Sequence, residues 1–314
     1  MFRLSAAQIK PLYEHRPWPN LKIPLFYLLW IGLGYLAWNS TSIWLTCAYY
    51  LGMGYIQMRI VTFMHDCTHS VLFKARWKNW AFGIISMIPL VISFMSFKDD
   101  HLQHHQFNRT EKDPDAFTMG RRSFVDYLLF YTYFLLGSVL LSTVWFGFLY
   151  AVIHLRGRKV WIHWSEMALH ASVYYFVLTW AYQNDILIQV LQIWLIPIVV
   201  LGYLNAVRFV AEHYGTPWNG GQLLGTRTII SNQVNSWFWN NINYHIGHHV
   251  YPAVPWYNLQ ELHALVLPEI TRVGAIVDKS YFGVFFNAFI RGPETPETSV
   301  ARRMETPLSP VPAN

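Results

Sequence analysis

Eight histidines of this chain fall into three short groups. The groups are His65/His69, His101/His104/His105 and His245/His248/His249. Residues three and four positions apart share one face of a helix, so each group is expected to direct its imidazoles into one space. Imidazole binds zinc, copper and iron, and about four ligands satisfy one zinc ion, so eight donors indicate two metal ions. A lone histidine is more often a hydrogen-bonded core residue, but three groups in one chain favour a metal centre.

The composition is that of a membrane protein. Of the 314 residues, 54% are hydrophobic and 13% are charged, whereas a soluble domain has about 25% charged residues. Two cysteines, Cys47 and Cys67, have neither the number nor the spacing of a disulfide framework or a thiolate metal site. We expect residues 1–20 to lie on the membrane surface, because this polar segment lacks the apolar core of a signal peptide. A single membrane domain is expected over 21–290, and a proline-rich, disordered tail over 291–314.

Four apolar runs are long enough to cross the hydrocarbon of a bilayer, which takes about 20 helical residues. They occupy residues 21–38, 42–64, 160–182 and 185–210, and short polar links join them into two hairpins. Neither link contains lysine or arginine, whereas basic residues are frequent in the other segments. The positive-inside rule therefore places the links outside and the histidines in the cytoplasm. We predict an all-α membrane protein with four transmembrane helices and a cytosolic, histidine-rich cap.

Two further apolar stretches, 80–97 and 125–155, do not fit simple crossings. A single crossing by 80–97 would place the first two histidine groups on opposite sides of the membrane. Residues 125–155 are long for one span and short for two, and Gly137 and Ser138 interrupt them. Both stretches are expected to be interfacial or re-entrant. The alternative is a six-helix protein, which would split the histidine groups unless further crossings compensated.

The histidine groups resemble the three histidine boxes of the integral-membrane fatty acid desaturase superfamily. The matching segments are HDCTH at 65–69, HLQHH at 101–105 and HIGHH at 245–249. The resemblance covers about residues 20–270 and includes the segments NNINY before the third box and YPAVP after it, with His263 as the last match. It implies a four-span helical bundle with a cytosolic cap, a non-haem diiron centre, and oxygen-dependent oxidation of an unactivated C–H bond on a lipid.

The resemblance also implies a ninth ligand, His213, between the last span and the third box. In acyl-CoA desaturases an asparagine four residues before this histidine helps to hold the second metal through water. Phe209 occupies that position here, and Asn205 or Asn241 are the residues that could replace the asparagine. Glu212 could accept a hydrogen bond from His213, as metal-bound imidazoles usually require, or could be a solvated carboxylate.

Three polar residues follow the second box: Asn108, Asp113 and Asp115. The two aspartates suggest general acid–base chemistry, but Asp-Pro-Asp is also a good turn, in which proline fixes the backbone and the carboxylates cap local amides. We favour a structural role in which these residues support the metal ligands.

The chemistry implied by the boxes needs components that side chains cannot supply. The protein contributes ligands, orientation and exclusion of water, while two iron ions and O2 as co-substrate would attack the C–H bond. A separate electron donor, such as a ferredoxin or cytochrome, is expected because the sequence has no haem box, cysteine cluster or G-x-G-x-x-G loop. Five basic residues could dock an acidic donor, or could only fix topology and contact anionic lipid. They are Lys74, Arg76, Lys78, Arg121 and Arg122.

The expected reaction is desaturation of a fatty acyl or acyl-lipid chain. Hydroxylation, carotenoid ketolation or hydroxylation, and terminal-alkene-forming decarboxylation stay open, because the same boxes support them in this superfamily. Another class is a histidine-lined metal transporter, although transporters tend to place their sites near mid-membrane. The expected partners are a lipid substrate, the bilayer and the electron donor, with no nucleic acid. The expected location is a bacterial inner membrane, with the active site facing the cytoplasm.

Overall fold

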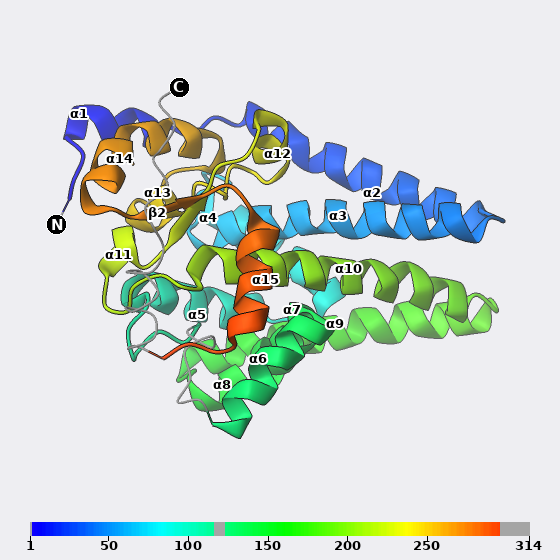
Figure 1. The fold of residues 1–314 in the computed structure, drawn as a ribbon. Coiled ribbons are helices and arrows are strands. Elements are labelled where there is room, and N and C mark those ends of the chain that lie inside the picture. Colours follow the sequence, from blue (N-terminus) through cyan, green and yellow to red (C-terminus); the bar gives the residue numbers. More distant parts are fainter. Residues whose placement is uncertain (1, 116–122, 296–314) are drawn as a thin grey trace.

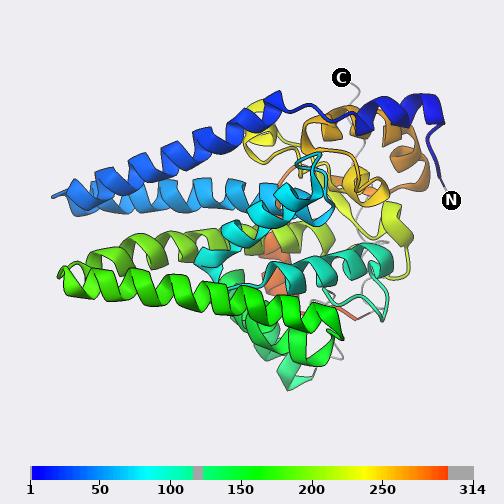
Figure 2. The same cartoon turned by 180° about the vertical axis from the view of Figure 1, so that it is seen from behind.

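The computed structural model describes residues 2–115 and 123–295. Four long helices lie side by side and project from a broad assembly of shorter elements (Figures 1 and 2). We call the long helices the stem and the shorter elements the cap. The stem consists of α2 (Lys22–Asn39), α3 (Ile43–Thr68), α9 (Arg158–Gln183) and α10 (Leu187–His213). These helices match the four predicted spans to within a few residues at each end.

The remaining elements follow one another along the chain with short connections. They are α1 (Ala6–Ile9), η1 (Lys10–Tyr13), η2 (Trp18–Leu21), α4 (Arg76–Met87), η3 (Ile88–Leu90), α5 (Phe94–Phe107), α6 (Phe124–Leu136), α7 (Ser138–Val144), η4 (Trp145–Leu149), α8 (Tyr150–Ile153), α11 (Gly221–Leu224), β1 (Arg227–Ile229), α12 (Gln233–Phe238), α13 (His245–Val250), η5 (Trp256–Asn258), α14 (Leu259–Val273), β2 (Ile276–Asp278) and α15 (Tyr281–Arg291). The two short strands pair in parallel, with Thr228 opposite Val277. This small sheet is the departure from the all-α prediction.

Length and composition identify fewer membrane spans than the four predicted. Two helical segments, 6–39 and α10, are long and apolar enough to cross a membrane, and the bent pair of α4 and α5 would make a third if counted as one span. Both α3 and α9 have the length of a span but bury polar side chains, among them Arg59 in α3 and Glu166 in α9. The arrangement of the stem therefore agrees with two hairpins, while the crossing of the membrane by α3 and α9 stays a prediction.

Two stem helices, α3 and α10, carry histidines at their cap ends. They have 26 and 27 residues and at 1.5 Å per residue are about 40 Å long, whereas the hydrocarbon core is about 30 Å thick. His65 lies in the last turn of α3, and His213 is the last residue of α10. The helices approach closely at Gly54, where a Cβ atom would lie 2.5 Å from Cβ of Val200 and 2.6 Å from the carbonyl oxygen of Pro197.

The two apolar stretches expected to be interfacial or re-entrant are broken helices. The pair α4 and α5 is bent by 105°, and α5 returns His101 to the side of His69, with 3.0 Å between their Nε2 atoms. The second stretch breaks at Gly137, as the sequence predicted, with φ +75°. A Cβ atom there would lie 2.9 Å from the backbone of Gly202 in α10, so both the dihedral angle and the close packing require glycine.

Both ends of the described chain pack onto the cap. Near the N-terminus, the carbonyl oxygen of Leu12 accepts a 2.8 Å hydrogen bond from Asn258. The tail predicted to be disordered from residue 291 is packed at its start. Glu294 is fully buried, pairs with Arg109 at 3.2 Å and accepts a 2.9 Å hydrogen bond from the amide of Gly215. These partners compensate the buried carboxylate and fix residues 292–295; residues 296–314 lie outside the described part.

Candidate metal centre

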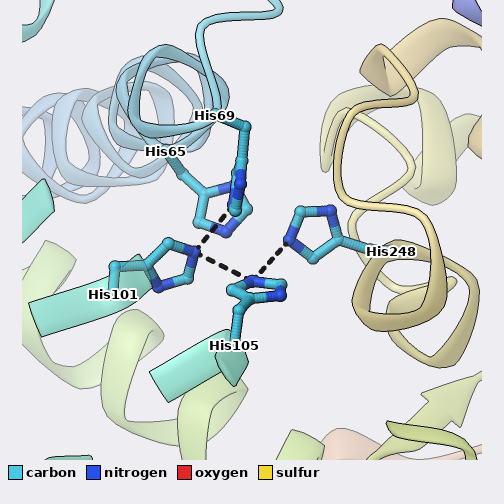
Figure 3. A group of neighbouring side chains, drawn as sticks. All are labelled: His65, His69, His101, His105 and His248. Atoms are coloured by element: carbon cyan, nitrogen blue, oxygen red, sulfur yellow. Dashed lines mark hydrogen bonds between the residues drawn. The ribbon is translucent and has the colours of Figure 1, made fainter. Parts of the chain in front are cut away.

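The histidine boxes meet in one buried region where α3, α5, α10 and α13 end or pass. Five imidazoles form a set that we call group A, and their ligand nitrogens all lie within 4.8 Å of one another. Group A consists of His65, His69, His101, His105 and His248. Figure 3 shows these rings converging on one space from α3 and its C-terminal residue, from α5 and from α13.

The nitrogen separations in group A fit a shared metal ion. Nε2 of His101 lies 3.0 Å from Nε2 of His69 and 3.1 Å from Nε2 of His105, and the same atom of His105 lies 3.1 Å from that of His248. Two nitrogens bound at right angles about 2.1 Å from one ion are about 3.0 Å apart. One ring nitrogen offers either one N–H or one lone pair, so a hydrogen bond cannot satisfy both contacts of His101. Nε2 of His65 is buried and has no hydrogen-bond partner among the described residues.

A second set, which we call group B, lies beside the first. It consists of His104, His213, His245 and His249, together with the carboxylate of Glu212. Nε2 of His245 is 3.1 Å from Nε2 of His213 and 3.1 Å from Nε2 of His249. The structure thus brings all nine predicted ligand histidines into two neighbouring groups, each with enough donors for one ion.

The second and third boxes are each divided between the two groups. His101 and His105 belong to group A while His104 belongs to group B; His245 and His249 belong to group B while His248 belongs to group A. The prediction that each box aims all its imidazoles into one space was therefore wrong for these two boxes. Neighbouring residues of a helix point about 100° apart, so only the pair four residues apart shares a target.

An apolar cavity of about 240 Å³ ends at both groups. His65 and His101 of group A, and His104, His213 and His245 of group B, line its metal end. The opposite walls are mainly apolar and come from the stem and from the broken helices. They include Met87, Leu90, Ile92, Leu141, Phe146 and Leu201. A flexible apolar chain in this cavity would therefore lie directly against the histidines.

Comparison with known proteins decides the family. The profile of the fatty acid desaturases matches residues 39–281, which include all three histidine boxes. The chain belongs to the fatty acid desaturase family. The resemblance that the boxes suggested is thereby confirmed, and the two histidine groups are the metal-binding clusters of a desaturase-family enzyme.

Curated relatives of this desaturase-family chain are distant. It is 26% identical to a Δ8-fatty-acid desaturase of Euglena gracilis over 263 residues, which cover 72% of this chain and 61% of the relative. It is 24% identical to fatty acid desaturase 3 of Homo sapiens over 283 residues, covering 74% and 60% of the two chains. With an sn-1 oleoyl-lipid 12-desaturase of Anabaena variabilis the identity is 28% over 280 residues, covering 75% and 73%. The chain thus spans about three fifths of the length of the first two relatives.

Asp113 supports a ligand of group B in this desaturase-family site. Its Oδ1 lies 2.8 Å from Nδ1 of His104, and its Oδ2 accepts a 2.8 Å hydrogen bond from the amide of Arg109. Asp115 donates its amide to Oδ1 of Asp113 at 3.0 Å and also lines the cavity. Metal-bound imidazoles usually have such a partner on the ring nitrogen that faces away from the metal. The Asp-Pro-Asp turn therefore both folds locally and orients His104.

Two supporting groups were missed in the sequence. Nδ1 of His249 lies 3.0 Å from Oε1 of Gln222 in α11, and Nδ1 of His213 lies 3.4 Å from the carbonyl oxygen of Gly225. Gln222 also donates a hydrogen bond to the carbonyl oxygen of His105. No local pattern distinguishes these residues, because they reach the histidines through tertiary contact from the segment between α10 and the third box.

The other polar residues predicted around the site lie farther from the imidazoles. Asn108 donates to Gln222 at 3.5 Å, and Asn241 donates to the backbone of Trp256 at 3.2 Å. Asn205 lines the cavity and donates to Ser138 at 3.0 Å. Among the described residues, the contacts of Asn241 do not include a histidine, so its polar group supports the loop before the third box.

The imidazoles of α13 are held in the state that binds metal. Burial, followed by the approach of His105, holds the pKa of His248 and His249 well below the usual value for histidine. Both rings therefore stay neutral at physiological pH, and neutral imidazole is the form that coordinates a metal ion.

Proposed function

We propose that this chain is a diiron desaturase of fatty acyl chains. The observation that carries the proposal is the apolar cavity that ends at both histidine groups. One iron would be held by group A and the other by group B, and the pair would supply the oxidising chemistry that amino acid side chains lack. Neutral, buried imidazoles suit iron in this role.

The proposed reaction removes one hydrogen from each of two adjacent carbons of the acyl chain and leaves a double bond between them. O2 accepts these two hydrogens together with two further electrons and two protons, and is released as two molecules of water. The two further electrons come from a separate donor, such as a ferredoxin or cytochrome. Lys74, Arg76 and Lys78 are basic residues that an acidic donor could contact; Arg121 and Arg122 lie outside the described residues.

The residues of this chain act by positioning and by exclusion of water. The apolar walls, including Leu90, Ile92 and Phe146, hold the acyl chain in line with the histidines and keep bulk water away from the reacting carbons. Asp113 fixes the orientation of His104 through its Nδ1 atom. The position of the double bond then depends on which carbons the cavity holds beside the metal ions.

We also propose that the four stem helices cross a bacterial inner membrane, with the cap in the cytoplasm. Both hairpin links, 40–42 and 184–186, lie at the end of the stem away from the histidines (Figure 1). Neither link carries lysine or arginine, whereas Lys74, Arg76 and Arg156 belong to segments beyond the other end of the stem. This asymmetry supports the orientation under the positive-inside rule.

Mass spectrometry of total lipids from a bacterial host tests the proposed reaction. The wild type is compared with His104→Ala, which removes a group B imidazole, and with His154→Ala, an exposed histidine outside both groups. We expect lipids that have lost two hydrogens in the wild type and in His154→Ala, and only host lipids in His104→Ala. Lipids that have gained oxygen, or chains with a terminal alkene, would refute desaturation in favour of the hydroxylase or decarboxylase reaction.

Metal analysis of the purified protein separates an oxidase from a transporter. We expect two iron ions per chain, one for each histidine group. Exchangeable zinc or copper without iron, together with unchanged host lipids, would instead support a metal-binding transporter.

A further inference from the structure

Glu212 faces the metal side of group B. Its Oε2 atom lies 3.5 Å from Nε2 of His245. The same nitrogen lies 3.1 Å from Nε2 of His213 and 3.1 Å from Nε2 of His249. Glu212 is therefore directed at the place where the imidazole nitrogens of group B converge.

Asp113 provides a direct contrast, because it approaches an imidazole from the opposite side. It contacts Nδ1 of His104, which is the ring nitrogen that a supporting residue normally occupies. Glu212 instead reaches Nε2 of His245, while Nδ1 of His245 is buried and has no hydrogen-bond partner in the described part of the chain. A carboxylate that only oriented His245 would be expected at that Nδ1 atom.

The surroundings of Glu212 favour a metal ion as its partner. Glu212 is 1% exposed, lines the cavity and pairs with Arg208 one turn earlier in α10, where Nη1 lies 3.2 Å from Oε1 and 3.0 Å from Oε2. Arg208 thus holds the carboxylate in one orientation. Three imidazole nitrogens and a carboxylate oxygen that meet without water repel one another through their lone pairs, and a shared cation removes this repulsion.

We infer that Glu212 is a direct ligand of the metal ion held by group B. This inference rests on the proposed diiron centre and deepens it. Group A then offers five imidazoles, whereas group B offers four imidazoles and one carboxylate. The anionic oxygen donor makes the two ions chemically unequal, because hard oxygen ligands favour the more highly charged state of a metal.

Removal of the carboxylate charge tests the assignment. Wild type, Glu212→Gln and Glu166→Gln are purified in detergent, loaded with iron(II), and analysed for iron per chain and for the affinity of each ion by chelator competition. Glu166 is the matched control, because it is also a buried glutamate of a stem helix, but it accepts hydrogen bonds from Ser93 and Met95 and belongs to neither group. We expect two tightly bound ions in the wild type and in Glu166→Gln.

In Glu212→Gln we expect one ion to bind as tightly as before and the other to bind on the order of 100-fold more weakly, since ligand loss should cost at least as much as loss of a supporting residue. Mössbauer spectra of samples loaded with ⁵⁷Fe should show that one of the two iron signals is altered or lost. Two ions of unchanged affinity and unchanged spectra in Glu212→Gln would overturn the inference.

A measurement on the wild type covers the case in which Glu212→Gln does not fold. Protein labelled with ¹³C-glutamate is compared by infrared difference spectroscopy before and after metal removal. A metal-dependent shift of a labelled carboxylate band is expected, and its absence would overturn the inference. Failure of the wild type to bind two ions is a different result, because it would refute the proposed diiron centre itself.

Discussion

Groups A and B are built from the same side chain but are held in place differently. Group A takes two pairs of histidines four residues apart, His65/His69 and His101/His105, and adds His248. Group B takes one such pair, His245/His249, and adds His104 and His213 from two other helices together with Glu212. Helical spacing therefore provides most of group A, whereas group B depends on the tertiary fold.

The support around the imidazoles differs in the same sense. In group A, Nδ1 of His105 is buried without a hydrogen-bond partner among residues 2–115 and 123–295, and the rings brace one another, with centroids 4.5 Å apart for His65 and His101. In group B, acceptors from Asp113, Gln222 and Gly225 contact three of the four imidazoles. A site assembled from separate elements needs these outer contacts to orient its rings, and a site made from helical pairs needs fewer of them.

The largest effect is expected from loss of one imidazole in each group. His69→Ala removes a ligand of group A and His213→Ala a ligand of group B, and each should lower turnover more than about 100-fold, because both ions are needed for the reaction. Iron per chain should fall toward one in both variants, while membrane insertion is retained. Product formation by lipid mass spectrometry at the wild-type level in either variant would contradict the ligand assignment.

A smaller effect, confined to group B, is expected for Asp113→Asn. The amide keeps the shape of the carboxylate but loses the charge that faces Nδ1 of His104, so one ion should bind about 10- to 100-fold more weakly. Chelator competition measures both affinities. Asp99→Asn is the control on the adjacent helix α5, because Asp99 pairs with Lys159 and belongs to neither group. Equal weakening of both ions would show that the two groups are not supported independently.

The smallest effect, shared by both groups, is expected for Gln222→Leu. This change removes the acceptor at Nδ1 of His249 and the donor to the carbonyl oxygen of His105. Each lost hydrogen bond costs about 1 kcal/mol, so affinity should fall several-fold at both ions. Isothermal titration with cobalt(II) measures the change. A loss at one ion alone would show that only one of the two contacts matters.

The sequence predicted the helices and the ligand histidines because these depend on local periodicity. The stem helices coincide with apolar runs separated by short polar links, and the break at Gly137 follows from a residue that tolerates positive φ. The boxes are visible because residues four apart share a helix face. The division of HLQHH and HIGHH between two ions was missed because spacing was taken to direct the middle imidazole with its neighbours.

Contacts between distant segments account for the remainder. Gln222 and Gly225 carry no pattern that marks them as partners of histidine, and Glu212 was expected beside His213 rather than beside Nε2 of His245. The packing of Glu294 against Arg109 likewise joins residues 185 positions apart, so a polar C-terminal segment gave no sign of burial. Each of these contacts is fixed by tertiary packing, which single-sequence periodicity does not encode.

The cap ends of α3 and α10 have an electrostatic consequence for the site. Both helices end beside the histidine groups, so the last carbonyl groups of two long helices point toward the place where the cations would lie. Aligned peptide dipoles give each such helix end a partial charge of about −0.5 of an elementary charge. The stem therefore does more than anchor the cap: its backbone lowers the electrostatic potential at a pair of sites whose imidazole ligands are neutral.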